Sequence, residues 1–201
     1  MSNLLQHLNQ LGKILLQVGE RVEGNLYCDI HPGNITINNN KVDNLRITAS
    51  GQSKICEIGV NAGHSLLFML DVNPTAEYSL FDIGLHKYLD PCFKYLQEQY
   101  SSTRMTLYLG DSKLTLPAFA ENHQGEYDFC HIDGGHNPPE FTSDYINSMI
   151  LLKKGGFIIF DDYDYPEIKA FVDEKIKLGE VIRFQEAPLF PTESHIVLRK
   201  V

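Results

Sequence analysis

Two groups of residues in this sequence have the types and spacing that chemistry requires. The first is the run Glu57–Ser65, in which Gly59 and Gly63 follow a short apolar segment and open a helical one. Glycines at such a turn let a ligand approach the backbone, and free N–H groups at the helix start attract an anion. A dinucleotide fingerprint would place glycine where this chain has Asn61 and His64, so the loop disfavours a pyrophosphate. A plain strand-to-helix turn is the alternative interpretation of the glycine pair.

Polar residues also follow the next two apolar segments. Asp82 ends the second predicted strand, where an acid can accept both hydroxyl groups of a ribose. Asp111 and Ser112 end the third, where their polar groups suit the edge of an adenine ring. Because the carboxyl ends of parallel strands meet at one edge of an open α/β sheet, we expect these residues to share a crevice with Gly59 and Gly63. A solvated acid at a strand end is the alternative for Asp82.

The second group is rich in acids. Asp133 ends the fourth predicted strand and Asp161 and Asp162 end the fifth, so the three carboxylates should converge. Such a cluster repels itself unless a cation or protons intervene, and an all-oxygen set suits Mg²⁺. His136 is the candidate general base, since an unperturbed histidine pKa lies near 6.5. Solvated acids are the alternative, as is a transition-metal site formed by His131, Asp133 and His136, although His131 fits a packed or hydrogen-bonded histidine better.

The elements that position these residues alternate between strands and helices, which is typical of βαβ units and a parallel sheet covered on both faces. The predicted strands are Lys54–Val60, Tyr78–Ile83, Met105–Leu109, Tyr127–Asp133 and Gly156–Phe160. The helices between and after them are Ser65–Leu70, Asp90–Tyr100, Leu114–Asn122, Glu140–Leu152 and Glu167–Lys177. Two strands then follow each other without a helix, at Val181–Glu186 and His195–Val201, which favours an antiparallel hairpin at the sheet edge.

The first fifty residues have a different pattern. One helix face carries Leu4, Leu5, Leu8, Leu11, Ile14, Leu15 and Val18, and Gly19 follows where a helix should stop. Packing on its own domain is favoured over a dimer face, and both interpretations stay open. Asparagines 38–40 suggest a turn between the extended segments Ile35–Ile37 and Val42–Ile47.

Over residues 50–201 these motifs resemble the class I S-adenosylmethionine-dependent methyltransferases, in particular the small-molecule O-methyltransferase-like group with an aspartate-rich metal site. The resemblance implies a Rossmann-like, mostly parallel seven-stranded sheet of order 3-2-1-4-5-7-6 with an antiparallel last strand. It implies that the cofactor is bound by Glu57, Gly59, Asn61, Gly63, Ser65, Asp82, Asp111 and Ser112. It also implies catalytic roles for His136 and Asp133, and Mg²⁺ ligands at Asp133, Asp161 and Asp162.

Composition is consistent with this. The 201 residues suit a single domain, with an N-terminal extension over 1–50 and a cofactor-binding core over 51–201. A net charge of −9 without a basic stripe disfavours nucleic acid as a partner, and no apolar run is long enough to span a membrane. Four scattered cysteines indicate reduced thiols and a cytoplasmic protein. We therefore expect O-methylation of a small-molecule hydroxyl, with a non-catalytic cofactor-binding subunit and a nicotinamide-dependent oxidoreductase as the alternatives.

Overall fold

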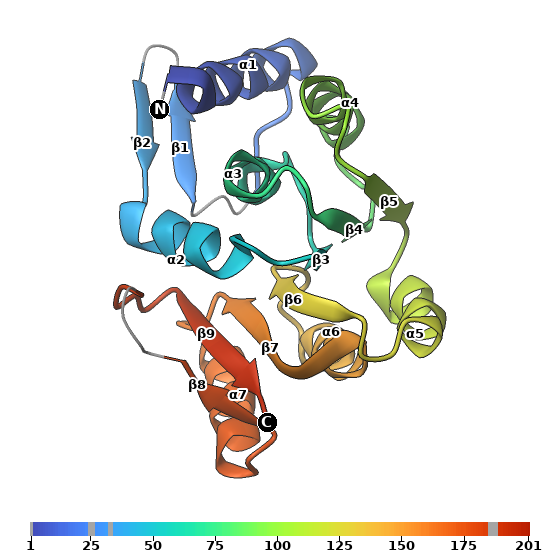
Figure 1. Cartoon of the computed structure of the whole chain (residues 1–201). Helices are drawn as coiled ribbons and strands as arrows, with labels where there is room; N and C mark the ends of the chain where they lie inside the picture. The colour runs from blue at the N-terminus through green and yellow to red at the C-terminus, as the bar shows by residue number, and fades with distance from the viewer. Residues whose placement is uncertain (1, 24–26, 32–33, 185–188) are drawn as a thin grey trace.

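A seven-stranded sheet runs through the middle of the molecule (Figure 1). The computed structural model describes residues 2–23, 27–31, 34–184 and 189–201. The strands are β3 (Lys54–Ile58), β4 (Glu77–Asp82), β5 (Met105–Leu109), β6 (Tyr127–Ile132), β7 (Leu152–Asp161), β8 (Val181–Arg183) and β9 (His195–Lys200). Their order is β5-β4-β3-β6-β7-β9-β8; β3 to β7 are parallel, and β9 is antiparallel to both β7 and β8. Counted along the chain, this is the predicted 3-2-1-4-5-7-6 arrangement, so the fold class is confirmed.

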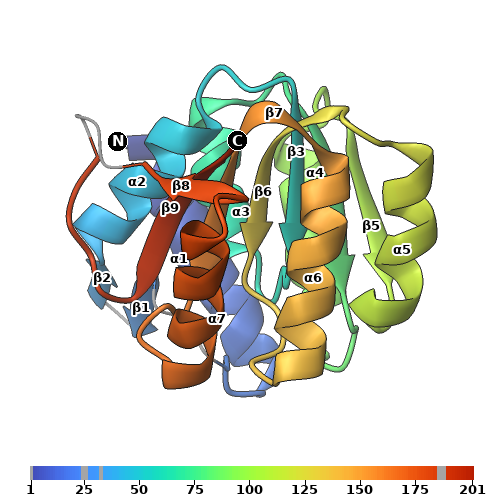
Figure 2. The same ribbon diagram turned by 90° about the horizontal axis from the view of Figure 1, so that it is seen from below.

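Helices cover both faces of the sheet, as its apolar central strands require. One face carries α1 (Ser2–Val18), α2 (Asn39–Ala49), α3 (His64–Val72) and α4 (Leu89–Gln99). The other carries α5 (Ser112–Asn122), α6 (Pro138–Leu151) and α7 (Pro166–Lys177), and α6 and α7 lie in front of the sheet in Figure 2. Across the described residues, no helix is long and apolar enough to cross a membrane.

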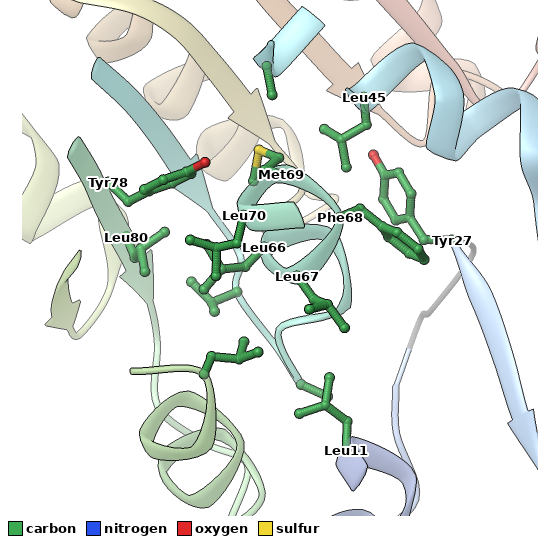
Figure 3. Packing of buried hydrophobic residues seen from close by; sticks show 14 of the residues in the cluster. Leu11, Tyr27, Leu45, Leu66, Leu67, Phe68, Met69, Leu70, Tyr78 and Leu80 are labelled. Carbon is green, nitrogen blue, oxygen red and sulfur yellow. The ribbon is translucent and has the colours of Figure 1, made fainter. Parts of the chain in front are cut away.

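The helix that follows the glycine loop lies at the centre of the larger core (Figure 3). Every residue of α3 from His64 to Leu70 is buried, because the helix is enclosed on all sides. Tyr78 and Leu80 of the sheet lie on one side of it, and Leu11, Tyr27 and Leu45 of the N-terminal extension lie on the other. The extension therefore completes the core around the helix that begins the candidate site.

The N-terminal region corrects one expectation from the sequence. The predicted helix is present as α1, with Leu4, Leu8, Leu11 and Leu15 buried against the chain's own core, whereas Leu5 is exposed.

A hairpin does follow, but it pairs β1 (Cys28–His31) with β2 (Asn34–Ile37), and Val42–Ile47 is helical. The Asn38 side chain caps α2 by accepting a hydrogen bond from the Lys41 N–H, and Val42, Leu45 and Ala49 recur at helical spacing on the buried face.

Candidate functional site

The residues singled out in the sequence lie at the carboxyl ends of β3 to β7, along one edge of the sheet. Glu57 lies near the end of β3, Asp82 ends β4, and Asp111 caps α5 after β5 by accepting from the Lys113 N–H at 2.9 Å. Ser112 is the first residue of α5. The parallel topology thus brings together segments that are far apart in the chain.

The loop after β3 has an unusual backbone. Gly59 and Gly63 have φ of 89° and 76°, and Asn61 between them has φ of 53°. A Cβ atom on Gly59 would overlap the backbone carbonyl of Asp133, because the ends of β3 and β6 pass very close together. The sequence suggested that a ligand needs this glycine; the structure shows that the chain itself needs it.

Gly59→Ala should therefore destabilise the protein by roughly 3 kcal/mol or more, since the clash is with backbone that cannot swing aside. Gly51→Ala is the matched control: its φ of 75° is also positive, but its Cβ would meet nothing within 4 Å. It should cost only about 1 kcal/mol, the ordinary penalty of a left-handed residue. Urea unfolding measures both, and equal losses would show that the contact with Asp133 is unimportant.

Asp82 organises the glycine loop. Its Oδ2 accepts from the N–H groups of Val60 (3.0 Å) and Asn61 (2.9 Å), and its Oδ1 accepts from Gly84 N–H (2.8 Å). A carboxylate oxygen can accept more than one hydrogen bond, so Oδ1 retains capacity for a ligand hydroxyl. Exposed apolar side chains lie at the ends of the same strands and the start of α5: Ile83, Leu85, Leu109 and Leu114. Beside Asp82 and Asp111, they offer apolar surface for a flat ring.

A buried polar chain begins at Glu57, which is completely inaccessible to solvent. Its Oε1 accepts a 2.5 Å hydrogen bond from Ser65 Oγ and lies 3.0 Å from His131 Nδ1. His131 Nε2 lies in turn 2.7 Å from the Tyr27 hydroxyl. Among the described residues, the other oxygen, Glu57 Oε2, has no hydrogen-bond partner. A small cavity beside this chain is lined by Tyr27, Ser65, Asp133 and residues 59–62 and 64.

A lysine that the sequence analysis did not single out enters the acid cluster. Lys41 Nζ lies 2.6 Å from Asp161 Oδ1, with both side chains buried, and 4.4 Å from the centre of the Tyr27 ring. Ligand atoms of His131, Asp133 and Asp161 lie within 4.8 Å of one another. Burial and the neighbouring Asp161 raise the pKa of the Asp133 carboxyl well above its usual range. Burial also raises the pKa of Asp161, although Lys41 opposes that shift.

The remaining acid is paired with the candidate base. Asp162 Oδ2 lies 2.6 Å from His136 Nε2, and this hydrogen bond raises the pKa of His136. Asp162 has φ of 54°, a strained value for a residue with a side chain, which directs the chain sharply at the end of β7. The Tyr165 ring lies beside the imidazole, with 4.8 Å between ring centres.

The helix that carries Lys41 is fixed to the far edge of the site by Asn44. Its Nδ2 donates to the carbonyl of Phe190 (2.8 Å) and to His195 Nε2 (3.0 Å), while its Oδ1 accepts from Phe190 N–H (2.7 Å). Burial lowers the pKa of His195 to about 3, so this imidazole is neutral and can accept. Three hydrogen bonds thus determine where the first turns of α2 lie.

These contacts bear on the Mg²⁺ that the resemblance implies. His131 uses both ring nitrogens, Asp161 is paired with the Lys41 ammonium, and Asp162 is paired with His136. Mg²⁺ demands near-octahedral oxygen ligands, and here it would first have to displace an ammonium or imidazole group. As arranged, Asp133, Asp161 and Asp162 do not fit a divalent cation.

Comparison with known proteins gives the same picture of the fold. A family model described as a methyltransferase domain matches residues 56–163, just over half of the chain. The apo structure of CalS11, a TDP-rhamnose 3′-O-methyltransferase of calicheamicin biosynthesis, is 18% identical with a TM-score of 0.61, over 79% of this chain and 76% of CalS11. A methyltransferase from Geobacter sulfurreducens is 8% identical to this chain, with a TM-score of 0.64. The match covers 98% of this chain and 88% of the Geobacter chain. A search of curated protein sequences finds no significant match.

Proposed function

Because this chain belongs to the methyltransferase family whose model matches residues 56–163, we propose that it transfers a methyl group from S-adenosylmethionine to a hydroxyl group of a small molecule. The family assignment favours this reaction over a nicotinamide-dependent oxidoreductase and over a subunit without turnover. The finer choices of donor and acceptor rest on the site.

The observation that carries the proposal is the unpartnered oxygen of Glu57. A buried carboxylate oxygen without a donor is costly, so such an atom in a native fold calls for a ligand that pairs with it. The donor molecule carries an α-ammonium group that can supply this hydrogen bond with charge. The carboxylate beside that ammonium suits the N-terminus of α3, which begins at His64.

The rest of the donor fits the neighbouring strand ends. Asp82 offers an oxygen to the ribose hydroxyls, and Asp111 with Ser112 suits the polar edge of the adenine. Exposed Ile83 and Leu109 supply apolar surface for the ring. These groups belong to different strands, and their order along the sheet edge matches the order of the ammonium group, ribose and adenine in the donor.

When bound, S-adenosylmethionine supplies a methyl group on a sulfonium, which transfers without a covalent enzyme intermediate. The protein must align the acceptor and remove its proton. With Asp162 paired to Nε2, His136 keeps its proton on that nitrogen and uses Nδ1 as the base. Neither a divalent cation nor a nucleic-acid partner is needed for these steps. The acceptor class agrees with that of CalS11, a TDP-rhamnose 3′-O-methyltransferase.

Calorimetry with S-adenosylmethionine tests the proposal, with S-adenosylhomocysteine and NAD as comparison ligands. We expect both sulfur compounds to bind with Kd on the order of micromolar, the usual range for enzyme substrates, and NAD not to bind. Binding of NAD without binding of the sulfur compounds would overturn the proposed function.

A further inference from the structure

Lys41 is unusual among the lysines of this protein because it is completely buried. Its Nζ lies 2.6 Å from Asp161 Oδ1, which is its ion-pair partner and is buried as well. Burying an ammonium group is expensive, and proteins retain such a group where a fixed positive charge is required.

The surrounding charges show what that requirement is. Four carboxylates lie at the ends of β3, β6 and β7: those of Glu57, Asp133, Asp161 and Asp162. His136 is paired with Asp162. Asp133 lines the cavity expected to hold the donor's ammonium group, and Glu57 accepts a hydrogen bond from Ser65, which lines the same cavity. Asp161 is left, and Lys41 neutralises it.

The position of Lys41 is built into the fold. Its helix is capped by Asn38 and is fixed at the site edge by the three hydrogen bonds of Asn44. The Tyr27 ring lies under the ammonium group, and its hydroxyl joins the His131 and Glu57 chain. The N-terminal extension thus supplies two adjoining parts of the site.

We infer that the Lys41 ammonium is the resident cation of the Asp161 carboxylate, and that this methyltransferase works without a divalent metal ion. Lys41 acts as a positioning residue: it holds the Asp161 carboxyl group in place, and it occupies the charge position that a metal would otherwise take. This inference rests on the proposed function only in assigning the site to methyl transfer.

Mn²⁺ binding, followed by electron paramagnetic resonance in the presence of S-adenosylhomocysteine, tests the inference directly. The wild type should leave added Mn²⁺ free, and Lys41→Arg, which keeps the charge, should behave in the same way. Lys41→Gln exposes the acids to the metal and should bind Mn²⁺ roughly 10-fold or more tightly than the wild type, with a matching rise in its melting temperature. Lys54→Gln is the control, because Lys54 pairs with Glu126 at the opposite end of β3.

One equivalent of Mn²⁺ bound by the wild type as tightly as by Lys41→Gln would overturn the inference. Should Lys41→Gln fail to fold, the wild type still decides: bound Mn²⁺, or a melting temperature lowered by EDTA, contradicts the inference, and indifference to both supports it. S-adenosylmethionine is titrated into the same samples. If the wild type binds both the donor and Mn²⁺, the inference is wrong and the proposed function still stands. If the wild type does not bind the donor, the proposed function is wrong, whether or not Mn²⁺ binds.

Discussion

Glu57→Gln should weaken S-adenosylmethionine binding by about 10- to 100-fold while leaving the free protein as stable as the wild type. The loss in affinity follows from a charge-assisted hydrogen bond, worth about 1.5–3 kcal/mol, between the Glu57 carboxylate and the donor's ammonium group. Stability should be spared because glutamine keeps the volume and an oxygen for Ser65 and His131, and removes a buried charge whose second oxygen has no partner among the described residues.

Calorimetry and urea unfolding on the same preparation check the two halves of this prediction. Glu77→Gln is the matched control, because Glu77 pairs with Arg104 at the start of β4, at the opposite end of the sheet. A stability loss with unchanged affinity would mean that Glu57 serves the fold alone, through His131 and Ser65.

The order of the sheet could be predicted from the sequence because two strong signals coincide. Apolar strands alternate with helices from Lys54 to Asp161, which requires parallel pairing, and the final two strands lack a helix between them, which requires a hairpin. Strand ends were right to within a few residues, although β7 begins at Leu152 rather than Gly156. Because polar residues at the carboxyl ends of parallel strands share an edge, the sequence correctly predicts that Asp82 lies beside the glycine loop and that Asp133 lies near Asp161.

The contribution of the N-terminal extension could not be predicted in the same way. The segment Val42–Ile47 begins and ends in a β-branched residue, which favoured a strand, but it packs against α3 as a helix. With the segment assigned to a strand, nothing marked Lys41 as buried. The helical spacing of Val42, Leu45 and Ala49 was the available signal, and it would have placed Lys41 beside the buried face.

Pairing among the polar residues was also beyond the sequence. Glu57 and His131 are register partners on β3 and β6, a relation that only the sheet order reveals. Likewise, the spacing of Asp133, Asp161 and Asp162 predicts that the three carboxylates converge, which suggests a metal site. The spacing does not show which positively charged group pairs with each carboxylate. Lys41 lies on α2 and pairs with Asp161, whereas His136 lies on the loop after β6 and pairs with Asp162.

His136→Ala should lower the rate of methyl transfer by about 10²- to 10⁴-fold, the usual contribution of a general base, while leaving donor binding intact. His136 lies on the loop after β6, is paired with Asp162, and is not one of the residues expected to hold the donor. Transfer of a radiolabelled methyl group to a panel of small-molecule hydroxyl compounds measures the rate, and calorimetry measures donor binding. His123→Ala is the control, because His123 forms a similar pair with Glu126 far from the strand ends that form the site.

The Asp162→Asn variant tests whether His136 acts as the general base or has only a structural role. In the wild type His136 Nε2 donates a hydrogen bond to Asp162, which raises the pKa of His136, so the neutral, basic imidazole is lost as pH falls through that raised value. The asparagine variant removes the negative charge, so the pKa of His136 and the acid limb of the rate profile should both move to lower pH. Asparagine tolerates the positive φ at this position, which keeps the backbone unchanged. NMR titration of the His136 ring gives the pKa without any acceptor, and the rate profile must follow it. A rate that stays constant while the ring titrates would remove His136 as the base, because the proton of the acceptor would then be leaving by another route.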